Sequence, residues 1–313
     1  MSGVQPRTTV VVVTWRGRDH ITACLDALAA QRSPHRTLVV DNASDDGTAD
    51  LIAAHPSRPD VLRLDRNRGY AGGLAAALAS VDTPYVAWLN DDAAPEPNWL
   101  AALEEALDAD PQAAAATSSM LLGDGATQSV GVTLTGDGYG ADVVLSGREV
   151  FGFCGGAALL RTDVLARSGG VPAAFFCYYE DTDTSWRLRL AGHQVVSVGP
   201  ARVRHRHGAS TRPGSALFHR WNERNRLLML LRCAPLLVAA REVARFLAIT
   251  LALPLRRLRG STVSAAANFR VPLRLRVLAE VLVRLPGTLV QRWMIGRRSV
   301  VSRRSVWRDW AGR

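Results

Sequence analysis

The N-terminal part of the chain alternates β-branched runs with segments of helical periodicity, and this alternation constrains the fold most strongly. The run TTVVVVTW at 8–15 is continuously apolar, as expected for a strand buried on both faces of a sheet. Residues 19–31 then carry apolar side chains at helical spacing, and further strands are expected at 37–41, 61–65 and 84–90. Strands that alternate with helices form βαβ units with right-handed crossovers. We therefore expect an α/β fold, with a mostly parallel sheet flanked by helices.

The rest of the chain is expected to be less regular at first and then helical. Residues 113–160 are rich in Gly and Thr and should contain short strands and a hairpin. The segment DTDTSWRLRLAG at 181–192 predicts a capped helix closed by Gly192, and the runs QVVSVG and ARVRH predict two short strands after it. From about residue 215, apolar stretches alternate with Arg in a helical pattern. We place a domain boundary after residue 230, so that residues 231–313 form a basic helical extension.

The positive charge of the chain is concentrated in this C-terminal region. The whole sequence of 313 residues has a formal net charge of +10, and its basic residues are Arg without Lys. Residues 254–313 contain 14 Arg against Glu280 and Asp309, a net of +12, so the preceding residues sum to −2. A polyanionic partner should therefore meet the C-terminal region.

Two alternatives stay open for the function of this extension. Arg276, Glu280 and Arg284 recur at i, i+4 and i+8 on an otherwise apolar segment, which favours helices that lie in the interface of an anionic membrane. The alternative is that the helices pack on the catalytic domain or on the second subunit of a homodimer. Nucleic acid is disfavoured as a partner, because the extension is too apolar and contains no recognisable binding module.

The cysteines, the N-terminal run and the longest apolar run indicate the cellular compartment of the protein. Cys24, Cys154, Cys177 and Cys233 are far apart and form no C-x-x-C pair, so neither a zinc site nor a disulfide framework is expected, and a reducing compartment is favoured. The N-terminal run is typical of a strand and not of a signal peptide. FLAITLALPL has about half of the ~18–20 apolar residues that span a bilayer. We expect a cytoplasmic protein, peripheral on the inner face of the cell membrane.

Polar residues follow two of the predicted strands. The stretch VAWLNDDAAP ends in two adjacent carboxylates, Asp91 and Asp92, which repel each other unless a positive group lies against them. A hard divalent cation with oxygen ligands would supply that charge, whereas the alternative is an acidic turn that caps the next helix. Asp41 also follows a strand, where it could accept a hydrogen bond from a ligand or cap the following helix. Because the carboxyl ends of parallel strands share one rim, both groups should lie together.

Three further motifs carry chemistry. Gly72 and Gly73 open a predicted helix and would leave room for a ligand against backbone amides, although the pattern is not G-x-G-x-x-G. The run FFCYYEDTDTSW places aromatic residues directly before Glu180 and Asp181, where a carboxylate beside an apolar wall can act as a general base or simply cap a helix. RVRHRHGAS at 202–210 offers imidazoles to a metal, or forms a basic surface loop.

In this order, the motifs resemble the family 2 glycosyltransferases of the GT-A fold, close to the bacterial rhamnosyltransferase and galactofuranosyltransferase type. The resemblance covers roughly residues 8–230 and rests on VVVTW at 11–15, VVDNASDDGT at 39–48, NRGYAGG at 67–73, LNDDA at 89–93, GFCGGAALLRTDVL at 152–165, YYEDTDTSWRLRLAG at 178–192 and HRHGAS at 205–210. Residues 8–112 would then bind the nucleotide sugar, and residues 113–230 would hold the acceptor and the catalytic groups.

The resemblance also implies roles for individual residues. Asp181 would be the catalytic base, and Asp92 and His205 would bind Mn²⁺ or Mg²⁺, with His207 as the less favoured histidine. The donor nucleotide would be bound by Thr14, Asp41, Asn67, Gly72, Gly73, Asn90 and Asp91. The acceptor or sugar pocket would be formed by Gly155, Gly156, Glu180 and Trp186.

The function implied by the resemblance is an inverting, metal-dependent transfer of a sugar from a UDP- or dTDP-sugar to a hydroxyl of a lipid-linked or cell-wall glycan. The sequence departs from the family pattern at Arg16, where Asn is usual, at Thr184, where Leu is usual, and after the Gly pair, where an Asn is missing. The departures at Arg16 and after the Gly pair fall in the expected donor pocket. The sequence therefore indicates the class of reaction more firmly than the identity of the donor. A nucleotidyltransferase and a catalytically inactive nucleotide-sugar-binding protein remain as alternatives.

Overall fold

The centre of the molecule is a nine-stranded sheet with strand order β3-β2-β1-β4-β10-β6-β11-β5, in which β7 also pairs with β6. The computed structural model describes residues 5–145, 147, 149–206, 214–259, 262 and 264–312. The strands of this sheet are β1 (Thr8–Thr14), β2 (His35–Asp41), β3 (Asp60–Arg63), β4 (Tyr85–Asn90), β5 (Ala93–Pro95), β6 (Ala113–Leu121), β7 (Thr127–Ser129), β10 (Ala157–Arg161) and β11 (Gln194–His205). A separate hairpin pairs β8 (Val132–Leu134) with β9 (Gly140–Asp142).

The strand directions agree with the expected α/β class. Strands β1 to β4, β6 and β11 run in one direction, whereas β10 lies antiparallel between β4 and β6. The predicted mostly parallel sheet with flanking helices is therefore confirmed. Strand β11 is one element where the sequence predicted two, because its pairing with β6 continues after a register shift between Val198 and Arg202.

Residues 113–160 contain the predicted short strands, β7 to β10, and the predicted hairpin, β8–β9. Strand β6 is longer than expected, with nine residues that are all buried. Its sequence, AAAATSSML, is poor in the residues that favour strands. Small side chains fit here because β10 and β11 pair with β6 on its two edges while both of its faces are covered. The tertiary context therefore overrides the weak local preference.

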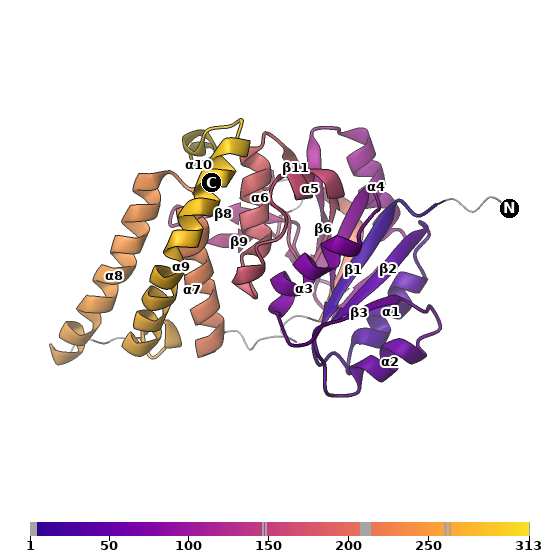
Figure 1. Cartoon of the computed structure of the whole chain (residues 1–313), viewed down its shortest axis with the longest axis horizontal. Coiled ribbons are helices and arrows are strands. Elements are labelled where there is room, and N and C mark those ends of the chain that lie inside the picture. The colour runs from indigo at the N-terminus through magenta and orange to yellow at the C-terminus, as the bar shows by residue number, and fades with distance from the viewer. Residues whose placement is uncertain are drawn as a thin grey trace.

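Helices cover both faces of the sheet (Figure 1). They are α1 (Ile21–Ala29), α2 (Thr48–Ala54), α3 (Gly69–Ala77), α4 (Trp99–Ala109), α5 (Thr162–Arg167) and α6 (Glu180–Leu190), with short 3₁₀ turns η1 (Leu78–Ser80) and η2 (Ala173–Phe175). Alternate residues of β1 enter two different cores: Val11 and Val13 belong to one, and Val10 and Val12 to the other. This division is what a β-branched run without polar positions predicts for a central strand.

Long C-terminal helices form a layer beside the sheet domain, at the left in Figure 1. They are α7 (Ala216–Cys233), α8 (Leu236–Leu258) and α9 (Val271–Arg298), with η3 (Ala267–Phe269) between the last two and α10 (Arg303–Trp310) at the end. The domain boundary expected at residue 230 lies inside α7. Helix α10 returns to the sheet domain, where Trp307 stacks on the buried Trp186 with ring centroids 5.9 Å apart.

Within the polar stripe of α9, Glu280 faces protein, whereas Arg276 is exposed to solvent. Glu280 pairs with Arg224 of α7 at 3.2 Å and with Arg220 of α7 at 2.5 Å. The prediction that this stripe lies at a membrane surface is therefore corrected for Glu280: its carboxylate joins α9 to α7 and is only 14% exposed. Packing on the catalytic domain, the alternative considered from the sequence, describes this face of α9.

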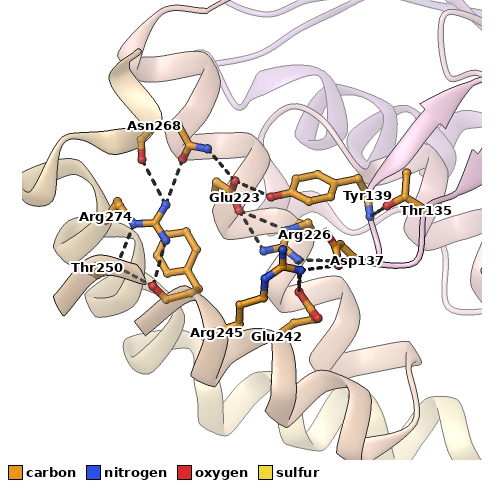
Figure 2. Close-up of polar contacts among 11 residues, drawn as sticks. Thr135, Asp137, Tyr139, Glu223, Arg226, Glu242, Arg245, Thr250, Asn268 and Arg274 are labelled. Atoms are coloured by element: carbon orange, nitrogen blue, oxygen red, sulfur yellow. Dashed lines mark hydrogen bonds and ion pairs between the residues drawn. The ribbon is translucent and has the colours of Figure 1, made fainter. Parts of the chain in front are cut away.

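A second polar network joins the C-terminal helices to the β8–β9 hairpin (Figure 2). Tyr139 of the hairpin donates a hydrogen bond to Glu223 of α7 at 2.8 Å, and Arg226 donates to the carbonyl of Asp137 at 2.8 Å. Arg226 also pairs with the buried Glu242 of α8 at 3.3 Å. Because buried charges are costly unless they are paired, these contacts specify how α7 and α8 dock on the hairpin.

The outer faces of α8 and α9 expose apolar stripes. On α8 these side chains are Leu237 near its start and, about one helical turn apart toward its end, Leu247, Leu251, Leu255 and Leu258. On α9 a similar stripe consists of Leu275, Leu282, Val283, Leu289, Val290 and Trp293. Within the described ranges of the chain, no helix is long and apolar enough to cross a membrane.

Candidate active site

A cavity of about 480 Å³ opens at the carboxyl ends of the parallel strands. Its walls come from the end of β4, the segment before β10, the β8–β9 hairpin, the end of β11 and the turn before α6. Most residues predicted for the site meet here: Asn67, Asn90, Asp91, Asp92, Gly155, Gly156, Glu180, Asp181 and His205. The predicted rim at the strand ends therefore exists, and segments far apart in the sequence build it.

Asp92 and His205 form a close pair at one side of the cavity. Asp92 Oδ1 lies 3.0 Å from His205 Nε2, and both side chains are less than 10% exposed. Strand β11 pairs with β5 through His205 and Ala93, so main-chain pairing holds the histidine next to the NDD segment. Burial raises the pKa of Asp92, but the hydrogen bond and charge of His205 outweigh burial and lower the pKa below its usual value. Asp92 is therefore an anion at neutral pH.

The surroundings of His205 suit a metal ligand. Its Nδ1 lies 2.8 Å from Gln128 Oε1, an acceptor, and its Nε2 lies 3.0 Å from Asp92 Oδ1 and 3.1 Å from Asn90 Nδ2. Gln128 is the outer partner that orients the imidazole toward Asp92. A cation held by Asp92 and His205 would take the place of the proton between Nε2 and Oδ1. Among the described residues no group of three or more His, Cys, Asp or Glu side chains is placed to hold a metal ion. A cation here would need further oxygen ligands from a bound diphosphate.

Asp91 turns away from Asp92 and is held by the N-terminal strand. Thr14 Oγ1 donates a hydrogen bond of 2.6 Å to Asp91 Oδ2, and His20 Nε2 lies 3.1 Å from the same oxygen. The hydrogen bond to Asp91 raises the pKa of His20. A Cβ atom on Gly17 would lie 2.2 Å from Thr14 Oγ1, so only glycine fits beside this contact. This arrangement separates the two adjacent carboxylates, which answers the charge problem of the NDD segment.

Asp181 lies at the start of α6, close to the backbone of Gly155. Its Oδ2 accepts a hydrogen bond from the Gly155 amide at 2.9 Å, and its Oδ1 accepts one from the Thr182 amide at 2.6 Å. A Cβ on Gly155 would lie 3.1 Å from the Asp181 side chain, so the glycine permits this close approach. Burial raises the pKa of Asp181 although these hydrogen bonds lower it. A carboxylate with a raised pKa is a stronger proton acceptor, as general-base catalysis requires.

Glu180 is a second buried carboxyl group in the cavity wall. It is 6% exposed, and its Oε2 has no hydrogen-bond partner among the described residues. Burial, and then the negative charge of Asp181, raise the pKa of Glu180 to about 8. Glu180 is therefore protonated at neutral pH and can donate a hydrogen bond, while Asp181 keeps the role of acceptor.

Five predicted site residues are not among those that line the cavity: Thr14, Asp41, Gly72, Gly73 and Trp186. Thr14 holds Asp91, which does line it. Asp41 is buried, accepts a hydrogen bond from the Ser44 amide at 2.9 Å and pairs with Arg63 at 2.9 Å. Its neighbour Asn42 lines the cavity instead. Helix α3 begins at Gly69, so Gly72 and Gly73 lie within it and not at its first turn. A Cβ on Gly73 would lie 2.5 Å from Val13, so this glycine permits close packing of α3 on β1.

Trp186 corrects the sequence prediction most clearly. It was expected in the acceptor pocket, but it is fully buried and packs against Phe151 and Trp307. In an 11-residue helix that begins at Glu180, Trp186 lies almost two turns beyond the cavity end. His207, the less favoured metal ligand, lies outside the described residues.

The cavity has an aromatic wall, of which the sequence indicated the half that precedes Glu180 and missed the half that comes from α7. Phe176 packs against Trp221 with ring centroids 4.7 Å apart, and Tyr178 packs against Phe218 at 5.3 Å. All four side chains line the cavity. Phe176 and Tyr178 come from the turn before α6, whereas Phe218 and Trp221 come from α7. The spacing of Phe218 and Trp221 by three residues is the one sequence signal that could have indicated a shared face.

Solved structures of low sequence identity share this fold. TarS 1–349 of S. aureus in complex with UDP-GlcNAc has a TM-score of 0.57 and 19% identity, and the match covers 97% of this chain and 91% of that one. GalNAc-T7 with UDP, GalNAc and Mn²⁺ has a TM-score of 0.62 and 13% identity, over 90% of this chain and 57% of that one. The fold is the GT-A glycosyltransferase fold.

The sequence family is also defined. The model of the family described as Glycosyl transferase family 2 matches residues 9–169, just over half of the chain, and the chain belongs to this family. Succinoglycan biosynthesis protein ExoO of Rhizobium meliloti is 34% identical over 106 residues, which cover 33% of this chain and 30% of that protein. Galactofuranosyltransferase GlfT1 of Mycolicibacterium smegmatis is 36% identical over 86 residues, which cover 26% of this chain and 28% of that protein. The chain thus matches less than a third of the length of these two relatives.

Proposed function

We propose that the protein is an inverting, metal-dependent glycosyltransferase that moves a sugar from a UDP- or dTDP-sugar to a hydroxyl of a lipid-linked or cell-wall glycan. The observation that carries this proposal is the cavity itself, which combines a buried Asp92–His205 pair with a buried Asp181 of raised pKa. Family membership and the GT-A fold support the reaction class. They also disfavour a nucleotidyltransferase.

Each group has a separate part in the proposed reaction. Asp181 accepts the proton of the acceptor hydroxyl, whose oxygen forms a bond to the anomeric carbon from the face opposite the leaving group. The bond from that carbon to the diphosphate oxygen breaks, and the nucleoside diphosphate leaves with the electron pair. Inversion follows from attack on the opposite face. A Mn²⁺ or Mg²⁺ ion bound by Asp92 and His205 would offset the negative charge of the diphosphate.

The donor side of the cavity is assigned to residues near the end of β2 and the start of α3. Asn42 and Asn67 line it, and both are fixed by backbone contacts: the Arg68 amide donates to Asn42 at 2.8 Å, and the Gly69 amide donates to Asn67 at 2.8 Å. Fixed amide side chains of this kind suit recognition of a nucleobase or a ribose. The aromatic wall on the opposite elements suits the apolar face of an acceptor sugar ring.

The test of this function is ligand-dependent thermal stability. We would melt the protein with UDP-, dTDP- and GDP-sugars, each with and without Mn²⁺. A ligand at 100 times its Kd should stabilise the protein by about 2.7 kcal/mol. A rise in melting temperature that occurs with one nucleotide class, and only when Mn²⁺ is present, supports the proposal and identifies the donor class. A folded sample that responds to none of them favours a protein that binds no nucleotide sugar.

The proposed location is the inner face of the cell membrane. Exposed Leu251, Leu255 and Leu258 on α8 lie beside exposed Arg256 and Arg257, a combination that suits the interface of an anionic membrane. Sedimentation with vesicles of anionic and of zwitterionic lipid tests this location. Binding to anionic vesicles alone, weakened by salt, supports it. Absence of binding together with a dimer in light scattering would assign the apolar stripes to a homodimer.

A further inference from the structure

The turn before α6, residues 175–179, is strained. Phe176, Tyr178 and Tyr179 have φ values of 67°, 70° and 69°, in the left-handed region that side chains larger than glycine rarely adopt. Phe176, with ψ of −62°, is the centre of a γ-turn closed by a hydrogen bond of 2.8 Å from the Cys177 amide to the Phe175 carbonyl. This form of the γ-turn is rare and unfavourable. Such conformations persist only where surrounding contacts impose them.

The strained turn leads directly into Glu180 and Asp181, the two carboxyl groups of the site. Tyr179 is the residue before α6, and Glu180 and Asp181 begin that helix. On its other side the turn packs against α3, where the Phe176 carbonyl accepts a hydrogen bond from the Ala71 amide at 3.0 Å. A Cβ on Gly69 would lie 2.2 Å from that carbonyl oxygen. The conformation of this turn therefore sets where Asp181 lies relative to the donor side of the cavity.

One side chain of α7 holds the turn. Asn225 is fully buried, and its Nδ2 group donates hydrogen bonds to the carbonyls of Phe175 at 3.0 Å, Cys177 at 2.8 Å and Tyr178 at 2.8 Å. These three carbonyls converge on a single amide group because the left-handed residues turn the chain back on itself. An aspartate of the same shape would instead place an acceptor against three acceptors.

The neighbouring arginine orients Asn225. Arg224 Nε donates to Asn225 Oδ1 at 2.9 Å, which directs the amide nitrogen toward the turn, and Arg224 Nη2 donates to the Phe175 carbonyl at 2.6 Å. Arg224 is itself paired with Glu280 of α9 at 3.2 Å. A chain of contacts thus leads from the C-terminal helices through Arg224 and Asn225 to the turn that carries Asp181.

We propose that Asn225 is a positioning residue of the transfer reaction: it holds the 175–179 turn in its strained conformation and so places Asp181 against the acceptor hydroxyl. The C-terminal helices are then part of the catalytic unit. This inference rests on the proposed function. Misplacement of a reacting group by about 1 Å can lower the rate about 100-fold. Loss of Asn225 should therefore lower kcat while the affinity for the donor nucleotide, which binds to other elements, stays unchanged.

The experiment compares Asn225→Ala, Arg224→Gln and the control Leu227→Ala in the full chain. Leu227 is fully buried in α7, about 200° around the helix from Asn225, so its truncation destabilises the protein without removing a hydrogen bond to the turn. Arg224→Gln keeps the Asn225 amide and leaves Glu280 paired with Arg220. It serves as the milder variant if Asn225→Ala does not fold.

Two readouts are measured on each variant, kcat and KM for the donor and amide hydrogen exchange of the peptide that contains 175–179. We expect Asn225→Ala to lower kcat 10- to 100-fold with KM within about threefold, Arg224→Gln to give a smaller loss, and Leu227→Ala to retain kcat. Exchange should rise at 175–179 in the first two variants only. Unchanged exchange there, or the same loss of kcat in Leu227→Ala, overturns the inference. If the wild type transfers no sugar, the proposed function fails, and the exchange data still decide whether Asn225 holds the turn.

Discussion

Glu180→Gln should remove a pH dependence of stability that arises from one buried carboxyl group. In the folded protein the pKa of Glu180 is raised from 4.5 to about 8, first by burial and then by the charge of Asp181. The folded state therefore keeps a proton that the unfolded chain releases as the pH rises above 4.5. Because the folded state binds more protons in this window, stability falls as the pH rises from about 4.5 to about 8. Glutamine is neutral throughout and resembles the protonated glutamic acid.

The size of the effect follows from the two pKa values. Between pH 5 and pH 7 the wild type should lose about 2.5 kcal/mol of unfolding free energy relative to Glu180→Gln, with 1.36 kcal/mol for each pKa unit. For a chain of this size that difference corresponds to about 4 °C in Tm. Relative to a pH well below 4.5, the wild type should have lost about 0.8 kcal/mol at pH 5 and about 3.4 kcal/mol at pH 7, while the variant keeps its stability.

The assay is a series of urea and thermal melts of both proteins between pH 5 and pH 8 in matched buffers. Glu105→Gln is the control, because Glu105 is an exposed carboxylate of α4 and its substitution changes charge without changing burial. The reasoning is refuted if the Glu180→Gln curve runs parallel to the wild-type curve over this range. In that case Glu180 is already ionised in the folded protein and would repel Asp181 at neutral pH.

Three further substitutions have defined outcomes. Asp181→Asn should lower kcat at least about 100-fold, because the amide cannot accept the proton, while nucleotide-dependent thermal shifts persist; near-normal turnover would exclude Asp181 as the base. Asp92→Asn should abolish the Mn²⁺ dependence of nucleotide binding by calorimetry, and an unaltered metal dependence would remove Asp92 from the metal site. Trp186→Ala should lower the unfolding free energy by about 3–5 kcal/mol in urea, since Trp186 fills the core and not the cavity. A stable Trp186→Ala variant with weaker acceptor binding would contradict this.

Several local features were predictable from the sequence because they depend on neighbours in the chain. The β-branched run of β1 and the strand that ends in Asn90 have the burial expected of central strands. The rim formed by the strand ends was also predictable, since parallel strands place their carboxyl ends together. Asp92 and His205, 113 residues apart, could be paired in advance only through a resemblance to a known family, because spacing carries no information over such a separation.

The errors have a common physical origin. Trp186 follows the aromatic and acidic motif in sequence, but helical geometry turns it into the core. Glu280 belongs to a stripe that indicated a membrane surface, yet it pairs with Arg220 and Arg224. In each case a distant segment supplies the partner.

The sequence by itself therefore determined the class of fold, the alternation of buried strands and helices and the identity of the carboxylates at the sheet rim. Only the tertiary structure decided which carboxylate faces the cavity, which one keeps its proton and which helix holds the strained turn. The physical reason is that periodicity and turn chemistry act over a few residues, whereas burial and charge pairing are set by segments far away in the chain. Asn225 illustrates the difference, because its three acceptors lie almost 50 residues before it.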